Sequence, residues 1–474
     1  MLLKTSKFFL YTAVFSVVVV MTSTFFPFIG GKDYFFRAAT ELALVFTLLY
    51  WAFEAGKGEV ESRFKNIFKR PLVIAVTAFA IVFLLASVFA YDGHAGFWSN
   101  FERGEGGFQV LHYYLFFLLL SLLFKTEKEW KLMFWMSIAA GTVMVLYGIG
   151  AALSIRYPSL FCATSGVGHS SCINFITPWQ GAANVPTGSL WAIFNDVRFQ
   201  GTLGNPAYVA PYIMYILFFL LYLWFSKFEK KAWLKNVGFA SLAVFFLFFF
   251  VLGQTRGAFL GLVAEVFTVL LFLTFSKKSM RKIGVIVIAM LLLFYGTLRY
   301  FKDAQFVQNL PLGRFLTIST TDDSAQTRFW TWGSAWKGFL ERPVLGWGPE
   351  NFTTVFDKYF DPRHFVPGKN TETWFDRAHS LFFDALAETG ILGFLAYFGM
   401  FATFFWEFFK KKISAIHAAG PGALVLAALV VAAPLGHLVQ GIAIFDVLPM
   451  FINLFLFLAF ATHYLYEGRE KHAA

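Results

Sequence analysis

A histidine lies where a long polar segment of the sequence meets an apolar run. The stretch reads Asp376-Arg377-Ala378-His379-Ser380, and an apolar segment long enough to cross a membrane follows it. If Asp376 is the N-cap of a helix, His379 is its third residue, and both the helix dipole and Arg377 favour a neutral imidazole. A neutral imidazole can act as a general base near pH 7. His379 is therefore the candidate catalytic residue; a histidine that only caps a helix at the membrane surface is the alternative.

Three arginines are further candidates: two stand near the ends of other apolar runs, and the third lies in the long polar segment before His379. The first, Arg198, precedes Gly-Thr-Leu-Gly-Asn-Pro, in which Asn205 and Pro206 predict the N-cap and first residue of a membrane-spanning helix. The unpaired N–H groups and positive dipole end of such a helix bind phosphate, and glycines allow a close backbone approach. The Arg198 guanidinium would add donors suited to phosphate oxygens. The alternative is an ordinary cap with a surface arginine.

The other two arginines are Arg256 and Arg328. Arg256 follows Leu-Gly-Gln-Thr between two apolar runs that almost touch, so we expect it in a tight hairpin at the membrane boundary. An arginine beside hydrocarbon is costly unless paired, so it reaches lipid headgroups or binds an anionic ligand. Arg328 begins an aromatic segment, 324–340, whose spacing predicts an amphipathic helix. A cation near a helix N-terminus is slightly unfavourable, which indicates a partner: Asp322, Asp323 or a phosphate.

The sequence shows no recognisable set of metal ligands. It also lacks the glycine-rich nucleotide-binding motifs and a nucleophile elbow. We therefore expect a site that works without a metal or another cofactor. The two cysteines, Cys162 and Cys172, lie in one polar loop. A disulfide is expected between them if that loop is extracytoplasmic, and a pair of free thiols is the alternative.

The composition places these residues in a membrane. The chain has 474 residues, of which 58% are hydrophobic and only 14% are charged, where a soluble protein carries roughly a quarter charged residues. We expect an all-α polytopic membrane protein with one integral membrane domain, 1–474. Apolar runs predict about twelve spans, near 8–28, 35–53, 71–91, 108–124, 132–153, 206–226, 237–254, 257–275, 283–301, 379–406, 420–441 and 446–466. The first run lacks a small-residue cleavage pattern, so we expect a retained helix rather than a signal peptide.

Basic residues predict the orientation of these spans. Every second connection between the apolar runs carries lysines and arginines, as at 57–70 and 125–131, which is typical of cytoplasmic loops. The net charge of +11 therefore reflects topology rather than nucleic-acid binding. We expect both termini in the cytoplasm and two long outer loops, 154–205 and 302–378. Loops of this length are usually functional or disordered, and the aromatic content of the second favours function.

Taken in order, these segments resemble the O-antigen ligase family. The resemblance rests on an Arg before Gly-Thr-Leu-Gly-Asn-Pro, on a Thr-Arg-Gly-Ala hairpin, and on Arg-x-x-x-Trp in the long loop. The resemblance extends to Pro-Val-Leu-Gly-Trp-Gly-Pro-Glu-Asn-Phe and then to Ala-His-Ser. It is completed by the Glu-Thr-Gly-Ile-Leu-Gly that follows. The similarity covers residues 195–400, and the rest of the chain is similar only in its helix count. One departure is Ser380, where many members have Asn.

The resemblance implies a glycosyltransferase of the membrane-embedded C-type (GT-C) architecture, with two long periplasmic loops. Such an enzyme takes a glycan from undecaprenyl diphosphate and transfers it on the periplasmic face of the bacterial inner membrane, without a nucleotide sugar or metal. By motif, His379 resembles the essential histidine of the family. Arg198, Arg256 and Arg328 resemble the arginines that bind the lipid diphosphate.

Three acceptors are compatible with this donor. Lipid A–core as acceptor would make the chain an O-antigen ligase of lipopolysaccharide biosynthesis, which is the leading hypothesis. An O-antigen or exopolysaccharide polymerase and a protein O-oligosaccharyltransferase are the alternatives. A polytopic anion transporter is more remote, because transporters tend to place charged sites near the membrane midplane. Here the candidate residues lie at span ends on one side, which favours an enzyme that acts among membrane lipids.

Overall fold

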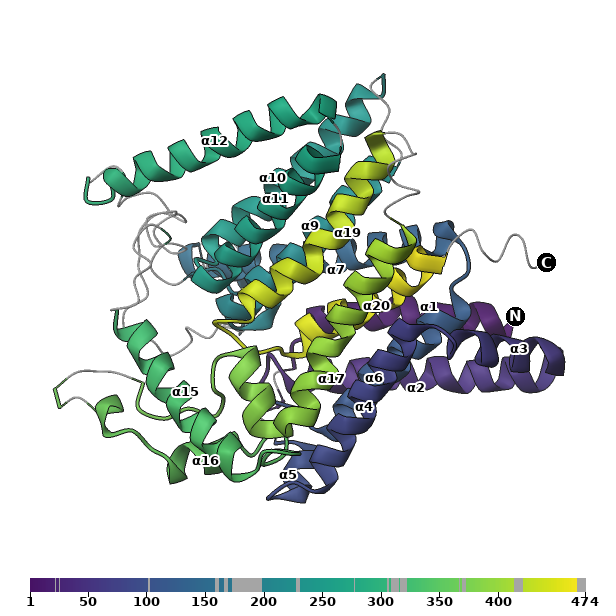
Figure 1. Ribbon diagram of the computed structural model, residues 1–474, viewed down its shortest axis with the longest axis horizontal. Coiled ribbons are helices and arrows are strands. Elements are labelled where there is room, and N and C mark those ends of the chain that lie inside the picture. Colours follow the sequence, from purple (N-terminus) through teal and green to yellow (C-terminus); the bar gives the residue numbers. More distant parts are fainter. Residues whose placement is uncertain are drawn as a thin grey trace.

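The computed structural model describes residues 1–466 except 22, 25, 101–102, 158–161, 166–168, 173–197, 227–230, 277, 305–306, 308–314, 316–321, 366, 369–371 and 413–420. Within these ranges, nine helices are long and apolar enough to cross a membrane. They are α2 (Gly30–Phe53), α4 (Pro71–Val88), α7 (Glu127–Arg156), α9 (Pro206–Ser226), α10 (Trp233–Leu252), α11 (Arg256–Ser276), α17 (Leu381–Lys411), α19 (Pro421–Gln440) and α20 (Leu448–Tyr466). The chain is therefore a largely α-helical, polytopic membrane protein (Figure 1).

Two further helices have apolar stretches that are shorter than those of the nine candidate spans. These are α6 (Gly107–Leu123) and α12 (Lys278–Tyr300), which is apolar from Gly284 onward. Every span expected from 35–53 onward coincides with one of these eleven helices, although the count of twelve is not confirmed.

The first expected span, 8–28, differs from the structure. Helix α1 covers Leu2–Ala13 and the 3-10 turn η1 covers Val14–Val18, so the helical backbone starts and ends earlier than expected. The valines at 17–20, where the helical backbone ends, have low helix propensity, and Pro27 cannot continue a helix. An apolar composition therefore extends beyond the segment that is helical.

Helix α20 lies at the centre of the membrane part. In the most apolar 18-residue stretch of α20, 89% is buried inside the protein, against 17% in the corresponding stretches of α10 and α11. Its phenylalanines pack edge-on or stacked against rings from neighbouring helices, as in Phe451 with Tyr113 and Phe460 with Phe134, at centroid distances of 5.1 and 4.9 Å. Such aromatic pairs contribute beyond the burial of their area. The low burial of α10 and α11 places these two helices at the periphery.

Glycines bring α11 and α19 into close contact. A Cβ at Gly261 would lie 2.7 Å from the carbonyl oxygen of Gly436, and one at Gly257 would lie 3.2 Å from the Cβ of Ala443. Small residues four apart allow helices in a membrane to approach in this way. The packing sets the start of α11, with Arg256, beside the connection that follows α19.

The long loop before α17 forms a small unit with its own core. It contains α15 (Asp323–Glu341), α16 (Phe352–Lys358) and the 3-10 turn η4 (Pro362–His364), and it lies beside α5 (Gly93–Trp98) in Figure 1. The amphipathic helix expected at 324–340 is confirmed as α15, and Asp322 caps it by accepting from the N–H of Ala325 at 2.7 Å. Buried residues of the unit include Trp347, Val355 and Phe356.

A kink in α17 anchors this unit. At Gly390 the backbone has φ 64°, which interrupts the helical hydrogen bonds. The helix carbonyls before the kink accept hydrogen bonds from the preceding loop instead. The N–H groups of Trp347 and Gly348 donate to the carbonyls of Ala387 and Glu388 at 2.9 and 2.8 Å. The Gly-Trp-Gly and Glu-Thr-Gly-Ile-Leu-Gly motifs are therefore parts of one structural joint.

The remaining elements are α3 (Lys57–Ile67), the turn η3 (Gly201–Leu203) and a two-stranded hairpin. The strands β1 (Cys162–Ser165) and β2 (His169–Cys172) are antiparallel, and the backbones of Cys162 and Cys172 are register partners. The side chains of both cysteines lie outside the described residues. Their disulfide stays a prediction.

Candidate functional site

The four residues singled out in the sequence line one cavity. It has a volume of about 690 Å³, and its lining includes Arg198, Arg256, Arg328 and His379. These side chains come from segments that lie far apart in the sequence. The volume is within the range of small-molecule sites, roughly 300–1,000 Å³. The structure therefore brings the predicted residues together.

Three helices begin at this cavity. The lining contains Asn205 and Ala207 at the start of α9, Gly257 at the start of α11, and Ser324 at the start of α15. The N-cap expected at Asn205 is confirmed, because its Oδ1 accepts from the N–H of Ala207 at 2.9 Å. The positive ends of three helix dipoles thus add to the arginine charges and favour an anionic ligand.

Arg256 occupies the expected tight hairpin, between the end of α10 and the start of α11. The hydroxyl of Thr255 donates to the carbonyl of Pro206 at 3.0 Å, which ties the hairpin to the start of α9. The Arg256 guanidinium forms an ion pair with Asp322 in which both side chains are about a quarter exposed. Asp322 was one of the expected partners of Arg328. In the structure it caps α15 and forms an ion pair with Arg256.

Arg328 lies in the first turns of α15. Burial lowers the pKa of its guanidinium, and the nearby carboxylate of Asp322 opposes that shift. Arg198 has a positive φ of 56°, and the following residue is fixed by a hydrogen bond from the Phe199 N–H to the Leu252 carbonyl at 3.0 Å. The end of α10 and the first turns of α15 thus hold two of the three predicted arginines, Arg198 and Arg328, at the cavity.

His379 does not begin a helix, contrary to the expectation. Helix α17 starts at Leu381 with Ser380 as its N-cap, and His379 precedes it with φ 54°. The N–H of Leu381 donates to the carbonyls of Gly441 and Ile444, at 2.8 and 3.1 Å. These contacts to the α19–α20 connection start the helix after His379, so Asp376 is not its cap and the expectation that His379 is the third helical residue was wrong.

The imidazole of His379 is nevertheless set up as a base. Its Nδ1 lies 3.1 Å from the carbonyl oxygen of Arg377, which can only accept, so Nδ1 carries the proton and Nε2 is left with the lone pair. The rings of Phe375 and Phe445 lie on two sides, at centroid distances of 5.3 and 5.2 Å. Burial lowers the pKa of His379, with the charge of Arg328 acting in the same direction.

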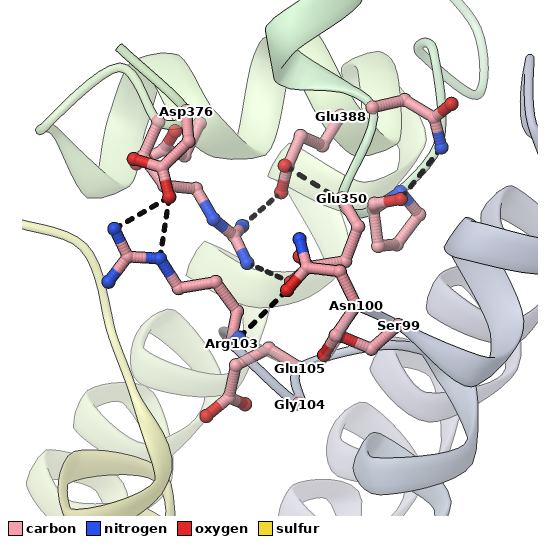
Figure 2. Close-up of polar contacts among 12 residues, drawn as sticks. Ser99, Asn100, Arg103, Gly104, Glu105, Glu350, Asp376 and Glu388 are labelled. Atoms are coloured by element: carbon pink, nitrogen blue, oxygen red, sulfur yellow. Dashed lines mark hydrogen bonds and ion pairs between the residues drawn. The ribbon is translucent and has the colours of Figure 1, made fainter. Parts of the chain in front are cut away.

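The structure adds cavity residues that sequence reasoning missed. Arg103 pairs with Asp376 at 2.6 Å (Figure 2). It also donates to the hydroxyl of Tyr208 at 2.6 Å and lies over the ring of Phe445 at 5.1 Å. Glu372 also lines the cavity, and burial raises the pKa of its carboxyl. Arg103 is a basic residue on the expected outer side, the same signal that drew attention to Arg256.

A buried ion cluster lies behind His379. The Arg377 guanidinium forms ion pairs with Glu350 and, at 2.6 Å, with Glu388 (Figure 2). The side chains of Arg377, Glu350 and Glu388 are exposed by only 8%, 2% and 6%. Burial by itself lowers the pKa of Arg377, but the two carboxylates outweigh it and raise the pKa. Asn100 donates to Glu350 at 2.9 Å. The cluster thus joins the α5–α6 connection, the long loop and α17.

Unusual backbone conformations gather at the same place. Among the described residues, five other than glycine have positive φ: Ser99, Arg198, Gln254, Glu350 and His379. Three of them line the cavity, and a fourth, Glu350, binds Arg377. Such residues cost free energy and concentrate at functional sites.

Part of the cavity wall is apolar. It includes residues 26–29 from the α1–α2 connection and residues 443–445 from the α19–α20 connection. A ligand with an anionic group and an apolar chain would match both parts of the lining. The described residues contain no group of three or more metal-ligating side chains, and metal independence stays a prediction.

Comparison with known proteins identifies one related family. Residues 241–398 match the family model described as O-antigen ligase. This segment begins in α10, ends in α17, and contains Arg256, Arg328 and His379. No curated protein matches the chain. The match confirms the resemblance found in the motifs for this segment of the chain.

Proposed function

With residues 241–398 matching the O-antigen ligase family, we propose that the chain transfers a glycan from undecaprenyl diphosphate to lipid A–core. The family match supports a membrane glycosyltransferase of the ligase or polymerase type. The observation that carries the finer proposal is the cavity, in which the half-buried imidazole of His379 and four arginines, Arg103 among them, meet at the starts of three helices.

The arginines are proposed to hold the diphosphate of the donor. Arg198, Arg256 and Arg328 line the same cavity as the dipole ends of α9, α11 and α15. When the bond between the anomeric carbon and the phosphate oxygen breaks, negative charge develops on that oxygen, and fixed donors stabilise it. Residues 26–29 offer apolar surface for the first isoprenoid units of the carrier.

His379 is proposed to activate the acceptor. Its Nε2 takes the proton of an acceptor hydroxyl as that oxygen forms the new bond to the anomeric carbon. The Nδ1–H remains bound to the carbonyl of Arg377, which stabilises the imidazolium that forms. The undecaprenyl diphosphate leaves with the electron pair of the broken bond. No redox partner is needed.

The proposed location is the bacterial inner membrane, with both termini in the cytoplasm and the cavity on the periplasmic side. Basic ends of α4 and α17 meet away from the cavity: Arg70 and Lys411 both lie over the ring of Tyr466, at 4.7 and 3.6 Å. That arrangement agrees with basic residues on one side of the membrane and the cavity on the other.

Transfer in vitro tests this function and its alternatives. Purified protein would receive an undecaprenyl diphosphate glycan together with lipid A–core, a second carrier-linked repeat unit or an acceptor peptide. We expect product only on lipid A–core, and its formation should be roughly 10²–10⁴-fold slower with His379→Ala. Product on the carrier-linked unit would identify a polymerase, and product on the peptide a protein oligosaccharyltransferase. Transfer by His379→Ala at the wild-type rate would remove His379 as the base.

A further inference from the structure

Helix α15 buries its small residues and exposes its large apolar ones. Its inward face, against the rest of the protein, consists of Thr331, Ser334, Ala335 and Gly338. The side chains turned outward are Phe329, Trp336 and Leu340, exposed by 41%, 46% and 59%. An amphipathic helix at a water-facing surface shows the reverse arrangement. The outer face of α15 is therefore built for an apolar environment.

This face continues into the surface of a membrane span. After α15 the chain reaches Pro343, whose carbonyl accepts from the N–H of Ile391 in α17 at 2.8 Å. The next residue, Val344, is exposed, and so are Ile391, Leu392 and Leu395 on α17. We call Phe329, Trp336, Leu340 and Val344 the outer stripe. The outer stripe adjoins apolar surface on a helix that is itself long enough to cross the membrane.

The direction of α15 fits the plane of a membrane. In Figure 1, α15 runs across the direction that α11 and α19 share. Because those two helices are candidate spans, a helix that crosses them lies along the membrane surface rather than through it. Lys337 is exposed next to Trp336, and a lysine at such a place can reach lipid headgroups while its stem stays in apolar surroundings.

We propose that the outer stripe of α15 lies in the bilayer, at the boundary between lipid headgroups and acyl chains. Amphipathic helices rich in Trp, Phe and Leu bind at this depth. The residue before the stripe is Arg328, which lines the cavity. A diphosphate at headgroup level would thus meet Arg328 without leaving the membrane surface. This role in donor entry rests on the proposed function, whereas the position of α15 does not.

Fluorescence quenching tests the position of α15. Full-length protein is placed in phosphatidylethanolamine–phosphatidylglycerol vesicles whose acyl chains carry bromine near the headgroup end. The emission of Trp336 is obtained as the difference between wild type and Trp336→Phe. We expect bromine to quench most of this emission and aqueous iodide to quench little. Trp347→Phe is the matched control, because Trp347 is 3% exposed and its emission should respond to neither.

Two results would overturn the position. Quenching by iodide but not by bromine would mean that the outer stripe faces water. Protection from both quenchers would mean that protein covers it, for example a second copy of this chain. Either result excludes the bilayer as the environment of Trp336.

A kinetic comparison tests donor entry separately. Leu340→Glu should raise the KM for the carrier-linked donor severalfold in vesicles and leave the KM for the acceptor unchanged, while Leu340→Phe keeps the wild-type values. An unchanged donor KM in Leu340→Glu would overturn donor entry along α15. If the wild-type protein transfers nothing from the carrier, the proposed function fails, and the quenching result still decides where α15 lies.

Discussion

The ring of His379 owes its protonation state to its immediate surroundings. Burial between Phe375 and Phe445 disfavours the imidazolium, and the positive charges of Arg328 and Arg103 add to that effect. The carboxylate of Asp376 and the carbonyl of Arg377 act in the opposite direction. The net result is a pKa below the ordinary value of 6.5, so the ring is neutral at pH 7. A base at this position needs no helix dipole.

This protonation state predicts a pH profile. Only the neutral imidazole can accept a proton, so the turnover number should fall as the pH drops through the folded-state pKa of His379. We expect the midpoint of that acid limb below 6.5 and a plateau above it. The profile is measured from about pH 5 to 8, where histidine titrates, with saturating donor and acceptor. His379→Ala should lose the limb together with roughly 10²–10⁴-fold of the rate. A wild-type midpoint above 6.5 would contradict this account.

Arg377 positions His379 through its own backbone carbonyl. The side chain of Arg377 is fixed between Glu350 and Glu388, and the carbonyl of the same residue accepts from Nδ1 of His379. Glu388→Gln removes one of the two charges that hold the guanidinium. The carbonyl should then shift, so that turnover falls, the acid limb moves, and the KM for the donor changes little.

A matched control exists at the other end of α17. Glu407 is also fully buried and binds Lys411, the N–H of Leu72 and the hydroxyl of Tyr466. Breaking a buried ion pair costs about 3–5 kcal/mol, so Glu388→Gln and Glu407→Gln should lower the unfolding temperature alike. Only Glu388→Gln should change the pH profile. An equal kinetic effect of both substitutions would reduce the Arg377 cluster to a stabilising role.

At the level of elements, the joint between the long loop and α17 decides where the site forms. Gly346 has φ 69°, and a Cβ there would lie 2.5 Å from the backbone carbon of Glu388. Gly346→Ala must therefore push the loop away from α17, in addition to roughly 1–2 kcal/mol for the left-handed backbone. We expect a lower unfolding temperature and reduced transfer, because the loop carries Glu350 and leads to His379.

Gly333→Ala is the control for that substitution. Gly333 lies within α15, and a Cβ added there meets nothing within 4 Å. Alanine favours a helix over glycine by about 1 kcal/mol, so stability should be unchanged or slightly higher. Thermal unfolding monitored by circular dichroism compares the two variants. If Gly346→Ala unfolds at the wild-type temperature, the joint is looser than its geometry indicates.

Apolar runs predicted most of these elements, and their ends show where the prediction fails. Hydropathy and the cap residues Asn205 and Pro206 located α9 correctly, and the spacing of aromatic residues located α15, because these signals are local. The start of α17 is set instead by Gly441 and Ile444, which are distant in sequence and accept from the N–H of Leu381. No local pattern could have shown that His379 lies before the helix.

At the scale of the whole molecule, the site is assembled from parts that the sequence keeps apart. The motifs and the alternation of basic residues led to Arg198, Arg256, Arg328 and His379, which line one cavity. The pairing of Arg103 with Asp376 was missed, because it joins the α5–α6 connection to the end of the long loop. The sequence marks charged residues at span ends but does not show which ends meet.

The orientation of this assembly gives the last prediction. Cysteines introduced as Lys358→Cys in α16 and Lys65→Cys in α3 would lie on opposite sides of the membrane, and the lysine side chains are exposed by 47% and 68%. A maleimide that cannot cross membranes should label Lys358→Cys in intact cells with a permeable outer membrane. It should label Lys65→Cys only after the inner membrane is opened. Wild-type protein controls for Cys162 and Cys172, which should react only after reduction if they form a disulfide. The reverse labelling would place the cavity in the cytoplasm, where the proposed periplasmic transfer could not occur.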